Sequence, residues 1–172
     1  MSERGDSIVL IGFMGAGKSS VGRALARMTG LPRFDTDELV AKRVGLSIPE
    51  IFAAHGEQAF RDAESAALRD LGDKDPAIVV TGGGAILPAG NREVLRKLGP
   101  VIFLAADDET LFERISRRPT RPLLQTENPR ATAAQLLRER LPLYREIADA
   151  EVDTTALTHD EVARKILELV QP

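Results

Sequence analysis

The chain has 172 residues, 43% of them apolar and 28% charged, a mixture typical of one ordinary globular domain, which we expect to span residues 1–172. It contains no cysteine, which excludes disulfide scaffolds, thiolate metal sites and thiol catalysis. Its formal net charge of −3 provides no bulk basic field. We therefore expect no nucleic-acid or membrane partner, and any bound anion must be held by local charges.

The chain begins with polar and charged residues. The apolar run that follows, Ile8–Ile11, is far too short for the core of a signal peptide or for a membrane span. Since the absence of cysteine also gives no sign of an oxidising compartment, we expect a cytoplasmic protein.

Short apolar runs that are rich in β-branched residues and lack alternation predict strands buried on both faces of a parallel sheet. Three such runs are Ser7–Ile11, Ala77–Thr81 and Pro100–Leu104. Two weaker candidates, Arg33–Asp35 and Glu151–Asp153, are predicted as strands because the alternation of strands and helices requires an element there.

Helix-start signals separate these strands. Capping-box spacing, a Ser or Thr followed three residues later by Glu, occurs at Ser47–Glu50 and at Thr158–Glu161. Asn128 before a proline is typical of an N-cap, and it predicts a helix running toward Ala148. Pro142 lies inside that helix and predicts a kink or a break there.

The repeated strand–helix alternation predicts an α/β fold with a doubly wound, five-stranded parallel sheet and ligands at the carboxyl ends of the strands. Two segments do not belong to the simple alternation of strands and helices. Residues 37–71 are predicted as a helical insertion that binds the acceptor. Residues 117–129, rich in proline and arginine, are predicted as a mobile lid.

The segment Gly12–Ser19, GFMGAGKS, matches the phosphate-binding loop G-x4-G-K-[ST] between a predicted strand and a predicted helix. Its glycines let backbone N–H groups and the helix N-terminus surround a polyphosphate. In such loops the lysine reaches the β- and γ-phosphates and the hydroxyl binds Mg²⁺. The predicted nucleotide contacts are Gly15, Ala16, Gly17, Lys18, Ser19 and Ser20.

The class of nucleotide-binding protein is narrowed by what is missing. No aspartate follows the run Ala77–Thr81, where a Walker B residue usually ends a strand, and a triple glycine stands there instead. No Asn-Lys-x-Asp motif for guanine occurs, and the chain is too short for a motor or transporter ATPase. Among proteins with a P-loop, these absences favour a small-molecule kinase.

Candidate acceptor residues follow the predicted strands. Asp35 and Asp37 are two residues apart on an extended segment and can face the phosphates together, although Asp35 could instead cap a helix. Arg61 and Glu64 share a helix face, either to bind a substrate carboxylate or as a surface ion pair.

Two further segments suit an anionic ligand. Gly82, Gly83 and Gly84 expose backbone N–H groups without side chains, and their entropic cost makes a plain turn a poor explanation. The segment 117–124 holds three arginines that could neutralise the transferring phosphoryl group or stack on adenine, or could form a solvated basic loop.

In series, the motifs GFMGAGKSS, FDTD, F-R-x-x-E, TGGGA, RPLL and LYR resemble the shikimate kinase family from Ile8 to about Leu169. The resemblance implies transfer of the γ-phosphoryl group of MgATP to the 3-hydroxyl of shikimate, in aromatic amino-acid (chorismate) biosynthesis. It implies Mg²⁺ as cofactor, ATP and shikimate as the small-molecule partners, and we expect a monomer.

The resemblance also implies roles. The catalytic residues are Lys18, Asp37 and Arg121, the last of these from the lid. The metal-binding residues are Ser19 and Asp35, with Asp35 expected to hold Mg²⁺ through water, which accounts for the missing Walker B aspartate. The shikimate-binding residues are Asp37, Arg61, Gly82, Gly83, Gly84 and Arg145. Arg117 and Arg121 are expected on the nucleotide, with Arg117 against adenine. The loop 154–158 lacks the arginine that some members carry near adenine.

Two other functions stay open at this point. A related small-molecule kinase for gluconate or a nucleoside monophosphate would share the P-loop, although the FDTD, GGGA and LYR set argues against it. A nucleotide-sensing module without activity would usually lack Lys18, Ser19 or Asp35, all of which are present.

Overall fold

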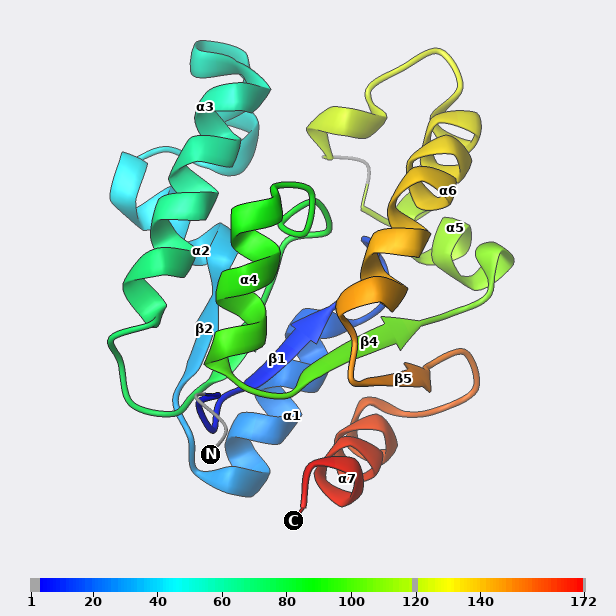
Figure 1. The fold of residues 1–172 in the computed structure, drawn as a ribbon. Helices are drawn as coiled ribbons and strands as arrows, with labels where there is room; N and C mark the ends of the chain where they lie inside the picture. The colour runs from blue at the N-terminus through cyan, green and yellow to red at the C-terminus, as the bar shows by residue number, and fades with distance from the viewer. Residues whose placement is uncertain (1–3, 119–120, 172) are drawn as a thin grey trace.

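The computed structural model describes residues 4–118 and 121–171, shown in Figure 1. This part of the chain forms one five-stranded sheet in the order β2-β3-β1-β4-β5, and every neighbouring pair is parallel. The strands are β1 (Ile8–Ile11), β2 (Arg33–Asp35), β3 (Ile78–Val80), β4 (Val101–Ala105) and β5 (Ala150–Asp153). All five predicted strands, the two weak ones included, are confirmed.

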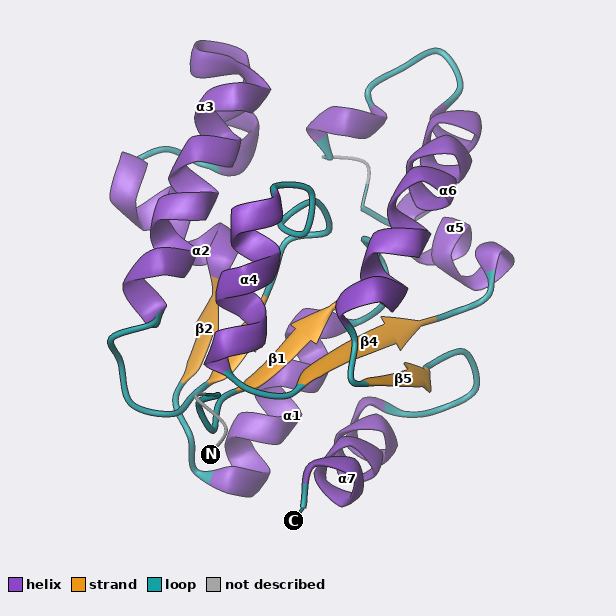
Figure 2. Cartoon of the chain, in the orientation of Figure 1, coloured by secondary structure: helices purple, strands orange, loops and turns teal. Residues whose placement is uncertain are grey.

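Helices cover both faces of the sheet, as Figure 2 shows. They are α1 (Lys18–Thr29), α2 (Thr36–Val44), α3 (Ile48–Leu71), α4 (Ala89–Leu98), α5 (Asp108–Ser116), α6 (Pro129–Ile147) and α7 (His159–Val170), with a 3-10 turn η1 at Pro122–Leu124. Helices α1 and α7 pack together on one face, while α4 and α6 contact β1 and β4 from the other. The doubly wound α/β prediction is confirmed.

The predicted helix starts are confirmed in detail. Ser47 and Thr158 each accept a hydrogen bond from the backbone N–H three residues later, and Glu50 and Glu161 complete both capping boxes. The Asn128 side chain caps α6 by accepting from the N–H of Ala131, 3.1 Å away.

Of the kink or break predicted at Pro142, the break does not occur. Pro142 lies inside the single helix α6, where packing of Leu137, Tyr144 and Ile147 into the core outweighs the missing backbone donor. The interruption lies instead in α3, at Gly56, whose φ of 84° and ψ of 172° suit only glycine.

The register of the sheet positions the candidate site. Strand β3 lies between β1 and β2, and Val80 pairs with both Leu10 and Asp35. The loops that follow these three strands therefore leave the sheet at the same edge. This brings the P-loop, the start of α2 and the triple glycine together. None of the helices among residues 4–118 and 121–171 has the length and apolar character needed to span a membrane.

Gly99 and Gly90 give a paired test of this packing. Gly99 joins α4 to β4 at φ 156° and ψ −164°, and a Cβ there would lie 1.8 Å from the carbonyl oxygen of Ser7. We expect Gly99→Ala to lower the free energy of unfolding by at least about 2 kcal/mol. Gly90 lies in α4 with nothing within 4 Å of its absent Cβ, so Gly90→Ala should raise stability by up to about 1 kcal/mol. Urea unfolding of both variants measures the difference, and equal effects would contradict the packing described.

Candidate active site

The P-loop wraps around its own lysine. Gly15 and Gly17 have φ values of 84° and 92°, and this left-handed backbone turns the chain into the N-terminus of α1. Lys18 is buried, and its Nζ donates to the carbonyls of Gly12 at 2.6 Å and Phe13 at 3.0 Å. Burial and the charge of Arg121 lower the pKa of Lys18 to about 7. An anion in the loop would offer this ammonium a stronger partner than the two carbonyls.

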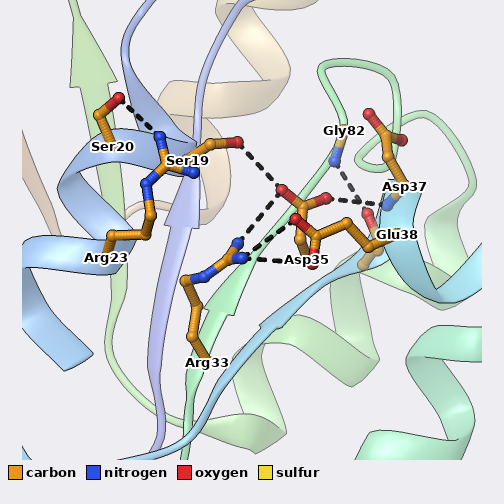
Figure 3. Close-up of polar contacts among 9 residues, drawn as sticks. Ser19, Ser20, Arg23, Arg33, Asp35, Asp37, Glu38 and Gly82 are labelled. Carbon is orange, nitrogen blue, oxygen red and sulfur yellow. Dashed lines mark hydrogen bonds and ion pairs between the residues drawn. The ribbon is translucent and has the colours of Figure 1, made fainter.

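Asp35 uses its two oxygens for two tasks (Figure 3). Oδ1 accepts the backbone N–H of Asp37 at 3.0 Å and so caps α2. Oδ2 accepts the hydroxyl of Ser19 at 3.0 Å. Both sequence interpretations of Asp35, as a helix cap and as a residue facing the phosphates, are therefore compatible. A hydroxyl and a carboxylate oxygen are the hard ligands that Mg²⁺ takes alongside phosphate oxygens, so this pair fits the metal.

A pocket opens beside the P-loop. Its charged lining consists of Asp37, Glu64, Arg61, Arg121 and Arg140, and its remaining lining of Met14, Ile48, Phe52, Phe60, Gly82, Gly83, Gly84, Pro122 and Leu123. Most of the predicted acceptor residues thus meet in one place, and the helices of the predicted insertion supply one wall.

The two carboxyl groups of the pocket flank Gly82. A Cβ on this glycine would lie 2.9 Å from Oδ1 of Asp37 and 2.8 Å from Oε2 of Glu64. Burial first, and then the charge of Asp35, raise the pKa of Asp37. Burial raises the pKa of Glu64 to about 7 in spite of the nearby Arg61. Both groups are therefore closer to exchanging a proton near neutral pH than ordinary carboxyls are.

Arg61 and Glu64 do not form a surface ion pair. Glu64 is 0% exposed, its Oε1 accepts from Nη1 of Arg61 at 3.0 Å, and its Oε2 has no hydrogen-bond partner. The guanidinium of Arg61 also lies where a side chain on Gly84 would be, with three atoms 2.5–2.6 Å from that Cβ position. The pair is thus held in the lining of the pocket, and Nε of Arg61 and Oε2 of Glu64 are buried without a hydrogen-bond partner.

Arg145 does not lie in the pocket, and this prediction is corrected. Its side chain is 58% exposed and pairs with Glu151 of β5 at 3.3 Å. Arg140, which sequence reasoning missed, lines the pocket instead and is only 3% exposed. The reason is helical geometry: the five residues from 140 to 145 rotate the side chain by about 140° around α6.

Tyr144 shares the face of Arg140, and its position supports that arginine. Its hydroxyl donates to the carbonyl of Gly83 at 2.5 Å, and its ring stacks on Phe103 of β4 at 5.1 Å between centroids. Nη1 of Arg140 lies 3.3 Å from where a Cβ on Gly83 would be. Gly83 is therefore contacted from two successive turns of α6, and a side chain there would have to displace the guanidinium of Arg140 slightly.

The predicted lid is only partly described, since residues 119–120 of the segment 117–129 lie outside the described residues. Arg121 lines the pocket, burial lowers its pKa, and its buried Nε has no hydrogen-bond partner. Arg117 is exposed and pairs with Glu113. Arg114, not singled out from the sequence, donates to the carbonyl of Gly15 at 3.1 Å and to Thr154 Oγ1 at 3.2 Å, and so links the P-loop to the loop after β5.

Comparison with known proteins agrees with this geometry. A family model described as shikimate kinase matches residues 14–171. A shikimate kinase of Thioalkalivibrio sulfidiphilus is 47% identical over 160 residues, covering 93% of this chain and 84% of the relative. One of Thermodesulfovibrio yellowstonii is 44% identical over 161 residues, covering 94% and 92%.

Solved structures give the same result. The shikimate kinase from Acinetobacter baumannii in complex with shikimate superposes with a TM-score of 0.92 at 41% identity, covering 98% of this chain and 94% of that one. A gluconokinase from Sinorhizobium meliloti, with a TM-score of 0.60 and 24% identity over 97% of this chain and 93% of its own, shares the fold alone. Over nearly its whole length, with the P-loop, the paired aspartates and the buried arginines in place, this chain belongs to the shikimate kinase family.

Proposed function

We propose that this protein transfers the γ-phosphoryl group of ATP to the 3-hydroxyl of shikimate. The observation that carries the proposal is the pocket in which Arg61, Arg140 and Asp37 lie together beside the P-loop. An acid with ring hydroxyls offers a carboxylate to the arginines and a hydroxyl to the aspartate. The family of the chain and the shikimate complex of the Acinetobacter baumannii relative support this choice of acceptor.

The arginines orient the acceptor. Arg140 is buried and the side chain of Arg61 is 11% exposed, and such planar groups hold a carboxylate through paired hydrogen bonds. The backbone N–H groups of Gly83 and Gly84 can approach the same ligand because these residues carry no side chain, whereas the N–H of Gly82 donates to Oγ1 of Thr36 at 3.0 Å. Glu64 holds Arg61 in place through their 3.0 Å bond. Fixing the acid end of the ring presents one hydroxyl to the phosphate in line.

On the phosphate side, Lys18 and Arg121 are placed to neutralise charge that spreads over the transferring group. Asp37 would accept or direct the proton of the attacking hydroxyl, and its raised pKa suits a proton acceptor. Ser19 and Asp35 would hold Mg²⁺, which when bound supplies further charge neutralisation on the phosphates. Arg117 against adenine, closure of the lid and a monomeric state stay predictions.

The direct test is release of ADP from MgATP by the purified protein with shikimate, gluconate, quinate, AMP or no acceptor. Turnover with shikimate alone is the expected result. Turnover with gluconate would instead favour the related kinase. ATP binding without turnover on any acceptor would indicate a nucleotide-sensing module and overturn the proposal.

Two arginines of α6 give a matched pair of variants. Arg140→Lys keeps the charge but loses the planar fork, so the KM for shikimate should rise about 10- to 100-fold, with the KM for ATP little changed. Arg145→Lys alters only an exposed ion pair and should leave both constants within about twofold. Steady-state kinetics with each substrate varied checks this. An effect of Arg145→Lys larger than that of Arg140→Lys would return the carboxylate contact to Arg145.

Glu64 predicts a pH-dependent stability. Its native pKa of about 7 exceeds the usual value of 4.5, so between these pH values the native state binds a proton that the unfolded state has lost. The stability that this group contributes therefore falls as pH rises from about 4.5 to 7. Relative to Glu64→Gln, which cannot titrate, the ligand-free protein should lose roughly 2 kcal/mol between pH 5 and 7.

Urea unfolding at both pH values measures this difference. Titration of Lys18 changes the stability mainly above pH 7, and there the stability rises with pH because the native state releases the lysine proton before the unfolded state does. This effect is present in the unaltered protein and in Glu64→Gln alike. Glu57→Gln is the control, since Glu57 also faces Arg61, at 3.6 Å, but is 51% exposed. A pH-dependent loss that persists undiminished in Glu64→Gln, or that Glu57→Gln removes to the same extent, would contradict the buried carboxyl.

A further inference from the structure

Arg33 lies at the start of β2, two residues before Asp35, so both side chains are on the same side of the strand. Its side chain is 18% exposed, and its Nη1 lies 3.6 Å from Oδ2 of Asp35. Its Nη2 donates to both carboxylate oxygens of Glu38, at 3.0 and 3.2 Å, as Figure 3 shows. A largely buried cation thus stands beside the aspartate of the metal-binding pair.

The oxygen that Arg33 faces is the one that the metal would use. Oδ1 of Asp35 is occupied as the cap of α2, and Oδ2 is the oxygen that accepts the Ser19 hydroxyl. Nη1 of Arg33 is buried and has no hydrogen-bond partner, and its distance from Oδ2 exceeds that of a hydrogen bond. The guanidinium therefore acts on Oδ2 through its charge and not through a bond.

Arg33 is also held in this position. Its Cδ lies 3.4 Å from where a Cβ on Gly22 of α1 would be, so its stem passes close against α1 one turn after Ser19. Glu38, on the first turn of α2, grips the other end of the guanidinium. A charge fixed between two helices cannot move far from an arriving cation, and repulsion at a few ångströms is only partly screened.

We propose that Arg33 is the built-in counter-ion of Asp35 and lowers the affinity of the Ser19–Asp35 pair for a divalent cation. The inference rests on the metal site of the proposed function. In the nucleotide-free protein the positive charge of Arg33 neutralises Asp35 as a metal ion would. A divalent cation therefore binds firmly only when the nucleotide phosphates add further negative charge. Glu38 reduces the repulsion by neutralising part of the guanidinium charge, and its 62% exposure makes that compensation incomplete.

The test is the effect of Mg²⁺ on ADP affinity, measured by isothermal titration calorimetry in saturating Mg²⁺ and in EDTA. The dissociation constant of ADP in EDTA divided by that in Mg²⁺ reports on the metal site without any catalytic turnover. Arg33→Met keeps most of the stem and removes the charge, and it should raise the ratio about fivefold. Glu38→Gln leaves the Arg33 charge unopposed and should lower it. Arg33→Lys retains a charge and should stay close to the unaltered protein.

Each outcome decides the inference. A ratio in Arg33→Met equal to or below that of the unaltered protein, in a variant with an unchanged melting temperature, would overturn it. If Arg33→Met does not fold, the substitution of the exposed Glu38 by Gln tests the inference. A ratio in Glu38→Gln that is unchanged or higher than in the unaltered protein would contradict it. A ratio of one in the unaltered protein would overturn the metal site and the inference together. A large ratio that is insensitive to Arg33 would leave the proposed function standing.

Discussion

The parallel pairing of β3 with both β1 and β2 is the constraint on which the active site depends. Val80 is level with Leu10 on one side and Asp35 on the other, so three loops far apart in the chain leave the sheet together. The hydrogen bond from Gly82 to the hydroxyl of Thr36 then joins two of these loops directly, at 3.0 Å. Because strands of a parallel sheet are fixed by their ladders, the sheet itself sets the positions of the P-loop, the start of α2 and the triple glycine, and helices α3 and α6 complete the pocket around them.

This arrangement concentrates buried charge at one edge of an acidic protein. The cations Lys18, Arg61, Arg121 and Arg140 gather there, although the chain carries a net charge of −3. Isolated buried charges are costly, and the raised pKa of Glu64 and the lowered pKa of Lys18 show that cost in the ligand-free protein. An anionic nucleotide and an acidic acceptor would supply the missing negative charge. The binding of two anions is thus favoured by the same desolvation that makes the empty pocket unfavourable.

Local sequence signals were sufficient for the fold and for half of the site. The P-loop, the capping boxes and the apolar strands each act within a few residues, and all were found where predicted. Arg140 was missed because its place in the pocket depends on which face of α6 packs against the sheet, and this is decided by tertiary structure. The neighbouring motif LYR indicated Arg145 instead. The only sequence signal of Arg140 is the spacing of four residues to Tyr144, the sole tyrosine. The helix continues through Pro142 for a related reason, since core packing overrode the local tendency of proline to end a helix.

Helix α6 connects the acceptor pocket to the segment predicted as a lid. It begins at Pro129, the last residue of that segment, and its buried face carries Arg140 and Tyr144 onto Gly83. The stacking of Tyr144 on Phe103 anchors this part of α6 to a central strand. Arg140 is therefore fixed to the sheet, whereas Arg121 directly precedes the short 3-10 turn η1, in which Leu124 is the buried residue. On the proposed function, Arg140 would set the position of the acceptor from a helix anchored in the core, and Arg121 would contact the nucleotide from a segment held by fewer buried residues.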